Sequence, residues 1–254
     1  MRIYLFALLT LFLISCNDDE FSVDCLPASL QDGVIAFYPF VNGDLTDGSS
    51  NDNAVMNNTS AVPSEDRAGN LDCAYEFNNT SGDDEFLLAS DPDFLDNLNR
   101  FSVSLWYEPL DTNRSAALYE VLVGRGSEGH CPDRRGEWSV GLFDCRRAVF
   151  GHDNSVWAHN SSGGCISEIL AVTEEWHHVV AIKDQDSYEI YFNGALQETA
   201  TGIANCSNPH IAEDIGDFFI GTNFTGRIDD ILIYNRALSP SEVTELFEVA
   251  PCCR

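Results

Sequence analysis

Several short stretches of this chain alternate apolar side chains with polar or small ones, and this period of two constrains the fold most strongly. The stretches lie at residues 34–40, 101–108, 137–142 and 188–192. Because successive side chains of a strand point to opposite faces of a sheet, the pattern predicts short strands with one buried face. Clusters of Gly, Asn, Asp and Ser between them are typical of turns. We therefore expect an all-β sandwich of two antiparallel sheets.

The pattern changes near the end of the chain, where a short helix is predicted. Ser239 stands at the expected N-cap, and Pro240 stands at the first helical position. Proline lacks a backbone N–H, and at this position the N–H of any residue has no acceptor within the helix, so nothing is lost. We expect this helix to end at about Phe247. The predicted fold class is thus all-β with a short C-terminal helix.

The first sixteen residues predict export from the cytoplasm. Arg2 precedes an apolar run over residues 3–14, which is about a dozen residues and shorter than the roughly 20 needed to span a bilayer. Such a run is typical of a cleaved signal peptide. The sequence around Cys16 resembles the bacterial lipobox, in which this cysteine is lipidated, and residues 17–20 resemble acidic runs that direct some lipoproteins to the cell surface. An ordinary signal peptide with an incidental cysteine is the alternative.

The chain therefore divides into four expected parts. Residues 1–16 are a lipoprotein signal ending at the lipidated Cys16, 17–32 an acidic tether, 33–248 one folded domain, and 249–254 a tail that contains cysteines. We expect a bacterial outer-membrane lipoprotein that touches the membrane only through its lipid and is exposed at the cell surface.

The charge of the chain excludes one class of partner. There are 13 basic and 41 acidic residues, and the formal net charge is −28. A surface this acidic repels nucleic acid, so nucleic-acid binding is excluded. All basic residues except Lys183 are arginines. Because arginine forms planar bidentate pairs with carboxylates, we expect many of them to pair with the abundant acidic residues.

The cysteines predict disulfides. The chain has nine cysteines, and eight remain after Cys16, an even number that predicts four disulfides in an exported chain. The eight are Cys25, Cys73, Cys131, Cys145, Cys165, Cys206, Cys252 and Cys253. They include no C-x-x-C pair, so a zinc site is not expected. Eight cysteines allow 105 pairings, and the sequence does not select among them.

Six segments, taken in order, carry a family pattern. They lie at residues 36–53, 75–78, 101–106, 176–180, 191–194 and 226–239. Together they resemble the laminin-G-like, concanavalin A-like jelly rolls over roughly residues 33–248. The resemblance implies two stacked antiparallel sheets with the first and last strands near each other. That proximity implies a disulfide from Cys25 to Cys252 or Cys253.

The same resemblance implies a structural calcium ion, which many relatives hold. The matching positions here are Asp229, the backbone carbonyl of Asn78 or Asn79, and Asp47. Calcium prefers about 6–8 oxygen ligands, and carboxylates and carbonyls are of the right kind. The alternative is that Asp229 and the adjacent Asp230 serve as partners of arginines.

Catalytic motifs are not found, so we do not expect an enzyme. Glycosidases need two closely spaced carboxyl groups, and no acidic pair of this kind lies on an apolar strand. Neither G-x-S-x-G nor H-E-x-x-H occurs. His177 and His178 are a routine strand feature of the resembled family, and we expect them to pack and to form hydrogen bonds. A lyase or hydrolase with dispersed catalytic residues is the alternative.

Residues 125–165 depart most from the family pattern, because arginines, cysteines and tryptophans replace a short hairpin. Such loops suit an acidic or sulfated sugar, through bidentate contacts from arginine and stacking on aromatic rings. The predicted ligand residues are Arg125, His130, Arg134, Arg135, Trp138, Arg146, Arg147 and Trp157. The alternative is that these arginines pair internally with Glu128, Asp133, Glu137 and Asp144. We therefore predict a surface-anchored, non-catalytic module that binds acidic or complex polysaccharide, with binding of an envelope or extracellular protein as the alternative.

Overall fold

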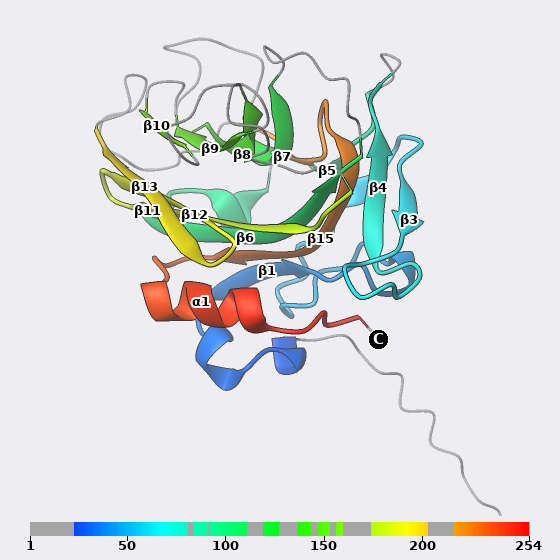
Figure 1. The fold of residues 1–254 in the computed structure, drawn as a ribbon, viewed down its shortest axis with the longest axis horizontal. Helices are drawn as coiled ribbons and strands as arrows, with labels where there is room; N and C mark the ends of the chain where they lie inside the picture. The colour runs from blue at the N-terminus through cyan, green and yellow to red at the C-terminus, as the bar shows by residue number, and fades with distance from the viewer. Residues whose placement is uncertain are drawn as a thin grey trace, which may run out of the picture.

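The structure is a computed structural model and describes residues 23–80, 84–90, 92–110, 119–126, 137–143, 147–152, 156–159, 174–202 and 216–253. In these residues the strands form two antiparallel sheets packed face to face, and one α-helix, α1 (Pro240–Glu248), lies outside them (Figure 1). We name the sheet that contacts α1 the back sheet, and the other the front sheet. The predicted fold class is confirmed.

The strands of each sheet lie side by side in an order unlike their order in the chain. In the back sheet the order is β13 (Ala195–Thr201), β12 (Ser187–Phe192), β11 (His177–Asp184), β6 (Arg100–Pro109), β15 (Thr225–Tyr234), β4 (Ala74–Asn78) and β3 (Val62–Ser64), and β1 (Val34–Tyr38) also pairs with β15. In the front sheet it is β10 (Val156–His159), β9 (Arg147–His152), β8 (Trp138–Phe143), β7 (Glu120–Arg125), β14 (Phe218–Ile220), β5 (Leu87–Ala89) and β2 (Met56–Asn57). Two short 3-10 helices precede β1, η1 (Val23–Cys25) and η2 (Ala28–Leu30), and two lie between strands, η3 (Val41–Gly43) and η4 (Asp93–Leu95).

The main core fills the space between the two sheets. Its centre is aromatic: the ring of Phe101 in β6 lies 5.0 Å from that of Trp138 in β8 and 6.0 Å from that of Phe150 in β9. All three side chains are buried. Burying a large apolar side chain stabilises the fold by roughly 1.5–3 kcal/mol. The alternation that predicted these strands therefore also identified the side chains that hold the sheets together.

A second core lies between the back sheet and α1. Phe37 of β1 and Leu232 of β15 point away from the main core and pack with Val243 and Leu246 of the helix. The helix begins as predicted, with Pro240 in its first turn and a capping box at its start. In the capping box the side chains of two residues accept hydrogen bonds from each other's backbone N–H groups. The helix is thus fixed at its start and buried along one face.

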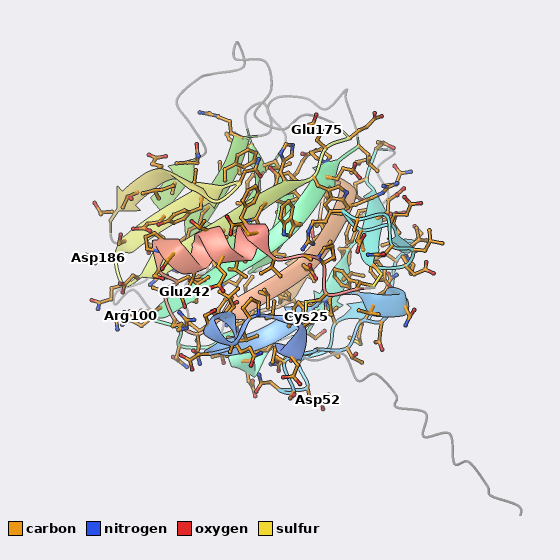
Figure 2. The ribbon with its side chains drawn as sticks, turned by 60° about the horizontal axis from the view of Figure 1, so that its bottom comes forward. Cys25, Asp52, Arg100, Glu175, Asp186 and Glu242 are labelled. Atoms are coloured by element: carbon orange, nitrogen blue, oxygen red, sulfur yellow. A yellow bond between two sulfur atoms is a disulfide. The ribbon has the colours of Figure 1, made fainter. Side chains whose placement is uncertain are left out.

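Two disulfides hold the C-terminal tail against the back of the domain. Cys25 is bonded to Cys252, which confirms one of the two pairings implied by the family resemblance, and Cys73 is bonded to Cys253. In Figure 2 Cys25 lies beside the strand β1, below the helix that carries Glu242. The other four cysteines of the predicted framework lie outside the described residues, at positions 131, 145, 165 and 206.

The folded body begins earlier than the sequence predicts. Residues 17–32 are expected to be a tether, but Leu26 and Leu30 are buried in the second core, and η2 packs beside α1. The hydroxyl of Tyr234 donates a hydrogen bond to the carbonyl of Leu30 at 3.0 Å. The predicted start of the domain at residue 33 is therefore wrong. Burying the apolar side chains of Leu26 and Leu30 stabilises the folded chain, so the segment that carries them is part of the domain.

In the described part of the chain, no helix is both long and apolar enough to cross a membrane. The predicted signal segment and Cys16 lie outside the described residues.

Candidate functional site

The outer face of the front sheet is formed by the alternate residues of its strands. In β8, Trp138 and Leu142 are buried in the main core, so Ser139 and Gly141 face outward. The strand register aligns Ser139 with outward positions of the neighbouring strands. We name this line across the sheet the front row, and it consists of Met56, Leu88, Phe219, Gly124, Ser139 and Gly151.

The front row carries no charged side chain. We name Met56, Leu88 and Phe219 its apolar end, and Gly124, Ser139 and Gly151 its flat end. At the apolar end Met56 is 49% exposed, and Leu88 and Phe219 are half-buried. The ring of Phe86 meets that of Phe219 edge-on, with centroids 5.6 Å apart. At the flat end glycines at two of the positions carry no side chain. Both glycines are buried, so the accessible part of the front row is its apolar end, beside this aromatic pair.

A second aromatic group borders the flat end. The ring of Tyr119 lies over Gly141, where an added Cβ would come within 3.0 Å of the ring and within 2.3 Å of the Glu120 carbonyl. The Tyr119 hydroxyl shares a hydrogen bond of 2.8 Å with Ser139, and its ring meets that of Phe143, with centroids 6.2 Å apart. Burial raises the pKa of Tyr119 above its ordinary value, so this phenol stays neutral. Only glycine at position 141 leaves room for this ring.

The predicted ligand residues are only partly placed. Four of them lie outside the described residues: His130, Arg134, Arg135 and Arg146. Arg147 in β9 is half-buried and lies opposite Phe143 in the register, at an outward position of the front sheet. Trp157 in β10 lies opposite Gly151, at the end of the front row.

Two predicted ligand residues belong to the interior, which corrects the prediction. Trp138 is 1% exposed, and its ring packs on Phe101 in the main core. Arg125 is also 1% exposed; it forms an ion pair with Asp96 and donates a hydrogen bond from Nε to the Gly216 carbonyl at 3.2 Å. Both occupy inward positions of their strands, so neither reaches a ligand on the outer face.

The aromatic residues of the front face were missed by the sequence reasoning. Phe86, Phe219 and Tyr119 stand in short segments for which no alternation was recognised. One signal was present, because Phe218 and Phe219 are adjacent. In a strand one of two adjacent residues faces outward, and here Phe218 is buried whereas Phe219 is half-buried.

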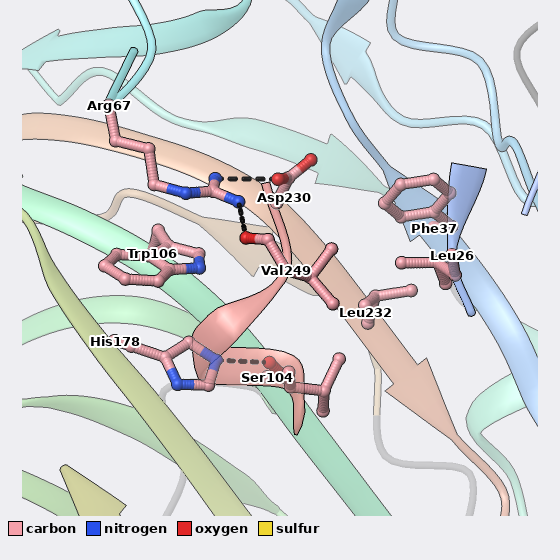
Figure 3. A pocket seen from close by; sticks show the side chains of 10 residues that line it. Leu26, Phe37, Arg67, Ser104, Trp106, His178, Asp230, Leu232 and Val249 are labelled. Carbon is pink, nitrogen blue, oxygen red and sulfur yellow. Dashed lines mark hydrogen bonds and ion pairs between the residues drawn. The ribbon is translucent and has the colours of Figure 1, made fainter. Parts of the chain in front are cut away.

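The outer face of the back sheet carries a buried cluster of charges instead. Asp229 and Asp230 are consecutive in β15, and Nη1 of Arg67 lies 2.9 Å from an oxygen of the first and 2.7 Å from an oxygen of the second. Nη2 of Arg67 donates a hydrogen bond to the carbonyl of Val249 at 3.2 Å. The guanidinium also lies over the Trp106 ring, 4.6 Å from its centroid (Figure 3). Burial and the neighbouring Asp230 carboxylate raise the pKa of Asp229, against the charge of Arg67.

The predicted calcium ligands do not form one site. Asp47 accepts hydrogen bonds from its own loop and from the backbone N–H of Phe37. Asn78 lies opposite Thr225, four residues before Asp229, which is roughly 13 Å along a strand. Calcium ligands lie within about 2.6 Å of one ion, so this set is wrong. Calcium binding at other residues stays a prediction. Among the described residues, no three His, Cys, Asp or Glu side chains are placed to hold a metal ion.

A small cavity lies beside the Arg67 cluster. It is lined in part by Trp106, Ser104 and His178 (Figure 3), and its volume of about 10 Å³ is room for one water molecule. His178 Nε2 is 2.9 Å from the Ser104 hydroxyl, and burial together with the charge of Arg67 lowers the pKa of His178 to about 3. Both predicted strand histidines, His177 included, are buried and packed, as expected. Small-molecule sites usually have about 300–1,000 Å³, so this cavity is not one.

Two stacked sheets with jelly-roll strand order, one of them bare of helix in the described residues, define the class of concanavalin A-like jelly rolls. The sequence profile of the concanavalin A-like lectin/glucanases superfamily matches residues 80–244, more than half of the chain. The chain belongs to this family. A comparison with curated protein sequences finds no match to it.

Solved structures share this fold. Domain 4 of AbnA, an extracellular arabinanase from Geobacillus stearothermophilus solved in complex with arabinotriose, is 22% identical, with a TM-score of 0.61 over 85% of this chain and 98% of that one. Botulinum neurotoxin type C, whose cell entry depends on two ganglioside molecules, is 16% identical, with a TM-score of 0.65 over 87% of this chain and 52% of that one.

A third similar structure is the binding domain of botulinum neurotoxin DC in complex with rat synaptotagmin II. It is 16% identical, with a TM-score of 0.64 over 86% of this chain and 52% of that one. This chain thus spans about half of both neurotoxin chains. At these identities the similarity shows the fold alone.

Proposed function

We propose that this protein is a non-catalytic carbohydrate-binding module that binds polysaccharide across the outer face of its front sheet. The observation that carries the proposal is the front row, in which an aromatic end adjoins glycine positions. Sugar rings have apolar faces that stack on aromatic side chains, and Met56, Leu88 and Phe219 present an accessible apolar surface of this kind. Ser139 and the Tyr119 hydroxyl are hydrogen-bonding groups at the same place. Members of the fold that bind arabinotriose or gangliosides support this choice of ligand class.

Four other predicted ligand residues, Arg134, Arg135, Arg146 and Arg147, extend the proposal to acidic or sulfated sugars. Arg147 lies at an outward position beyond the aromatic group of Tyr119 and Phe143. A carboxylate or sulfate on the sugar would receive paired hydrogen bonds from such a guanidinium. The absence of catalysis is part of the proposal, because the front row carries no carboxyl group that could act as an acid or a base.

The proposal also places the module at the cell surface. The apolar run at residues 3–14 and Cys16 support a lipid anchor in a bacterial outer membrane. A module held at the surface meets extracellular polysaccharide without diffusing away, so a weak site is sufficient when several copies contact one chain.

A glycan screen tests the proposed function. The full chain with Cys16→Ser, secreted through an oxidising compartment, is applied to an array of neutral, uronic and sulfated polysaccharides, with calcium present. We expect saturable binding to one class of polysaccharide. If that class is acidic, replacing Arg134 and Arg135 by Ala should weaken binding. Folded protein that binds nothing on the array would contradict the proposal.

Binding of a protein is the second candidate function. Met56 in β2 and Phe143 in β8 are 49% and 38% exposed, and exposed apolar side chains that form one patch contribute to protein interfaces. The neurotoxin domain bound to synaptotagmin shows that the fold can serve this purpose. Competition separates the two candidates: free sugar should displace the ligand of a lectin and leave a protein partner in place.

A further inference from the structure

We propose that Arg67 is a built-in cation that takes the place of a divalent metal ion at the paired aspartates of β15. The inference is independent of what the front face binds. It concerns Asp229 and Asp230, the first of which corresponds to a calcium ligand in the family that the chain resembles.

The geometry places one positive charge between two negative ones. A single nitrogen of Arg67, Nη1, lies 2.9 Å from Oδ2 of Asp229 and 2.7 Å from Oδ2 of Asp230. The exposed fractions of the three side chains are 9%, 0% and 8%. Two adjacent buried carboxylates repel each other and are costly to desolvate unless a cation lies close to both. Arg67 supplies that cation from the chain itself.

The surroundings suit a guanidinium better than a metal ion. The flat group lies over the indole of Trp106 at 4.6 Å, a cation–π contact, and its second nitrogen binds the Val249 carbonyl at 3.2 Å. Oδ1 of Asp229 and Oδ1 of Asp230 are buried, and in the described part of the chain neither accepts a hydrogen bond from a side chain; the backbone N–H groups of Asp230 and Cys252 lower the pKa of the two carboxylates. If the guanidinium were removed, these two oxygens could bind a divalent metal ion.

Arg67 also joins parts of the chain that are distant in sequence. It comes from the turn between β3 and β4, its two acidic partners lie in β15, and Val249 follows directly after α1. Asn70 in the same turn donates a hydrogen bond to the Cys253 carbonyl at 3.1 Å. A cation at this point therefore holds the C-terminal tail against the back sheet, and here no ion has to be taken from solution.

Thermal unfolding of the full chain with Cys16→Ser tests the inference. The parent and its Arg67→Ala variant are each measured in excess calcium and in EDTA. We expect the variant to lose roughly 10 °C in Tm, because it leaves two buried carboxylates without a cation. Calcium should then raise the Tm of the variant by several degrees more than that of the parent. Adding Asp229→Asn to the variant should remove this gain.

Arg227 offers a matched control on the same strand. Its guanidinium also contacts two carboxylates, those of Glu76 and Glu108 at 3.0 and 3.2 Å, but its side chain is 26% exposed. Glu76 is 35% and Glu108 10% exposed, so when the arginine is removed water reaches this pair of carboxylates more easily than it reaches Asp229 and Asp230. Arg227→Ala is therefore expected to respond to calcium no more than the parent does.

Terbium luminescence provides a second readout at the same place. Because Trp106 lies against the guanidinium, a terbium ion in place of Arg67 should be sensitised by this tryptophan in Arg67→Ala, and Trp106→Phe should remove the signal. Arg67→Gln, which keeps much of the side chain's volume, replaces Arg67→Ala if the latter does not fold. Equal calcium responses of parent and variant, with no terbium signal above the parent's, would overturn the inference.

Discussion

The two outer faces of this sandwich obey the same strand alternation but carry opposite kinds of residue. On the back sheet the outward positions hold large side chains such as Phe37 and Leu232, which α1 and the tail cover. On the front sheet they include Gly124, Gly141 and Gly151, and in the described residues no helix covers them. The helix, both described disulfides and the Arg67 cluster all lie at the back. Stability is thus concentrated away from the face that we propose binds a ligand.

The largest expected effect tests whether Arg125 belongs to the interior. Arg125→Ala should lower the free energy of unfolding by about 4 kcal/mol, because it removes a buried cation that pairs with Asp96. Chemical denaturation measures this loss. Binding by the fraction that is still folded should be unchanged. If the variant kept its full stability but bound the ligand more weakly, Arg125 would be a ligand residue and not an interior one.

The next effect concerns the disulfides at the back. Replacing Cys25 and Cys252 together by Ser opens a link between residues 227 positions apart, and removal of a native disulfide typically costs about 2–5 kcal/mol. Denaturation should show a loss in this range. Ligand affinity below the unfolding transition should stay the same, because the front row is on the other side of the sandwich. A loss of affinity without a loss of stability would contradict the separation of the two faces.

The main core was predictable from sequence because it depends on a simple period. The alternation at residues 101–108 identified both β6 and the side chains that contact the front sheet. The start of α1 was equally clear, since Ser239 and Pro240 carry its signal locally. The pairing of Cys25 followed from family resemblance and not from spacing, which leaves every pairing open.

The candidate site was less predictable, because it depends on register. The front row brings together residues of six strands, from β2 to β9 across the front sheet, that lie far apart in the chain. A shift of one residue in the register of any of these strands would turn its side chains to the other face of the sheet. The same reasoning explains the errors at Trp138 and Arg125: arginine and tryptophan suit a sugar site, but here both point inward. The pairing of Arg67 with Asp229 and Asp230 likewise joins positions more than 150 residues apart, 162 and 163 residues.

A smaller effect tests the front row directly. Phe219→Ala should weaken binding to the ligand found in the screen by about tenfold, because it removes the ring of an aromatic contact at the apolar end. Isothermal titration measures the affinity. Leu196→Ala is the matched control, since Leu196 is 51% exposed and lies in β13 of the back sheet. Equal affinities of both variants and the parent would move the binding site away from the front row.

The smallest effect concerns the start of the helix that covers the back. Burial alone would raise the pKa of Glu242, but hydrogen bonds from Arg236 and from Ser239 outweigh it and lower the pKa from 4.5 to about 2. A carboxyl group with a lowered pKa stabilises the fold above its unfolded pKa and loses that contribution as the pH falls through the folded one. Glu242→Gln should therefore cost about 1 kcal/mol at pH 7.

This cost should disappear as the pH falls from about 4.5 to about 2, the interval between the two pKa values of Glu242. Urea denaturation of parent and variant at a series of pH values measures the difference. Glu248→Gln, at the exposed end of the same helix, serves as the control, and it should cost less than Glu242→Gln at pH 7. A difference that stays constant with pH would mean that the charge of Glu242 does not hold α1 in place. Packing against Phe37 and Leu232 would then be sufficient to keep the back face covered.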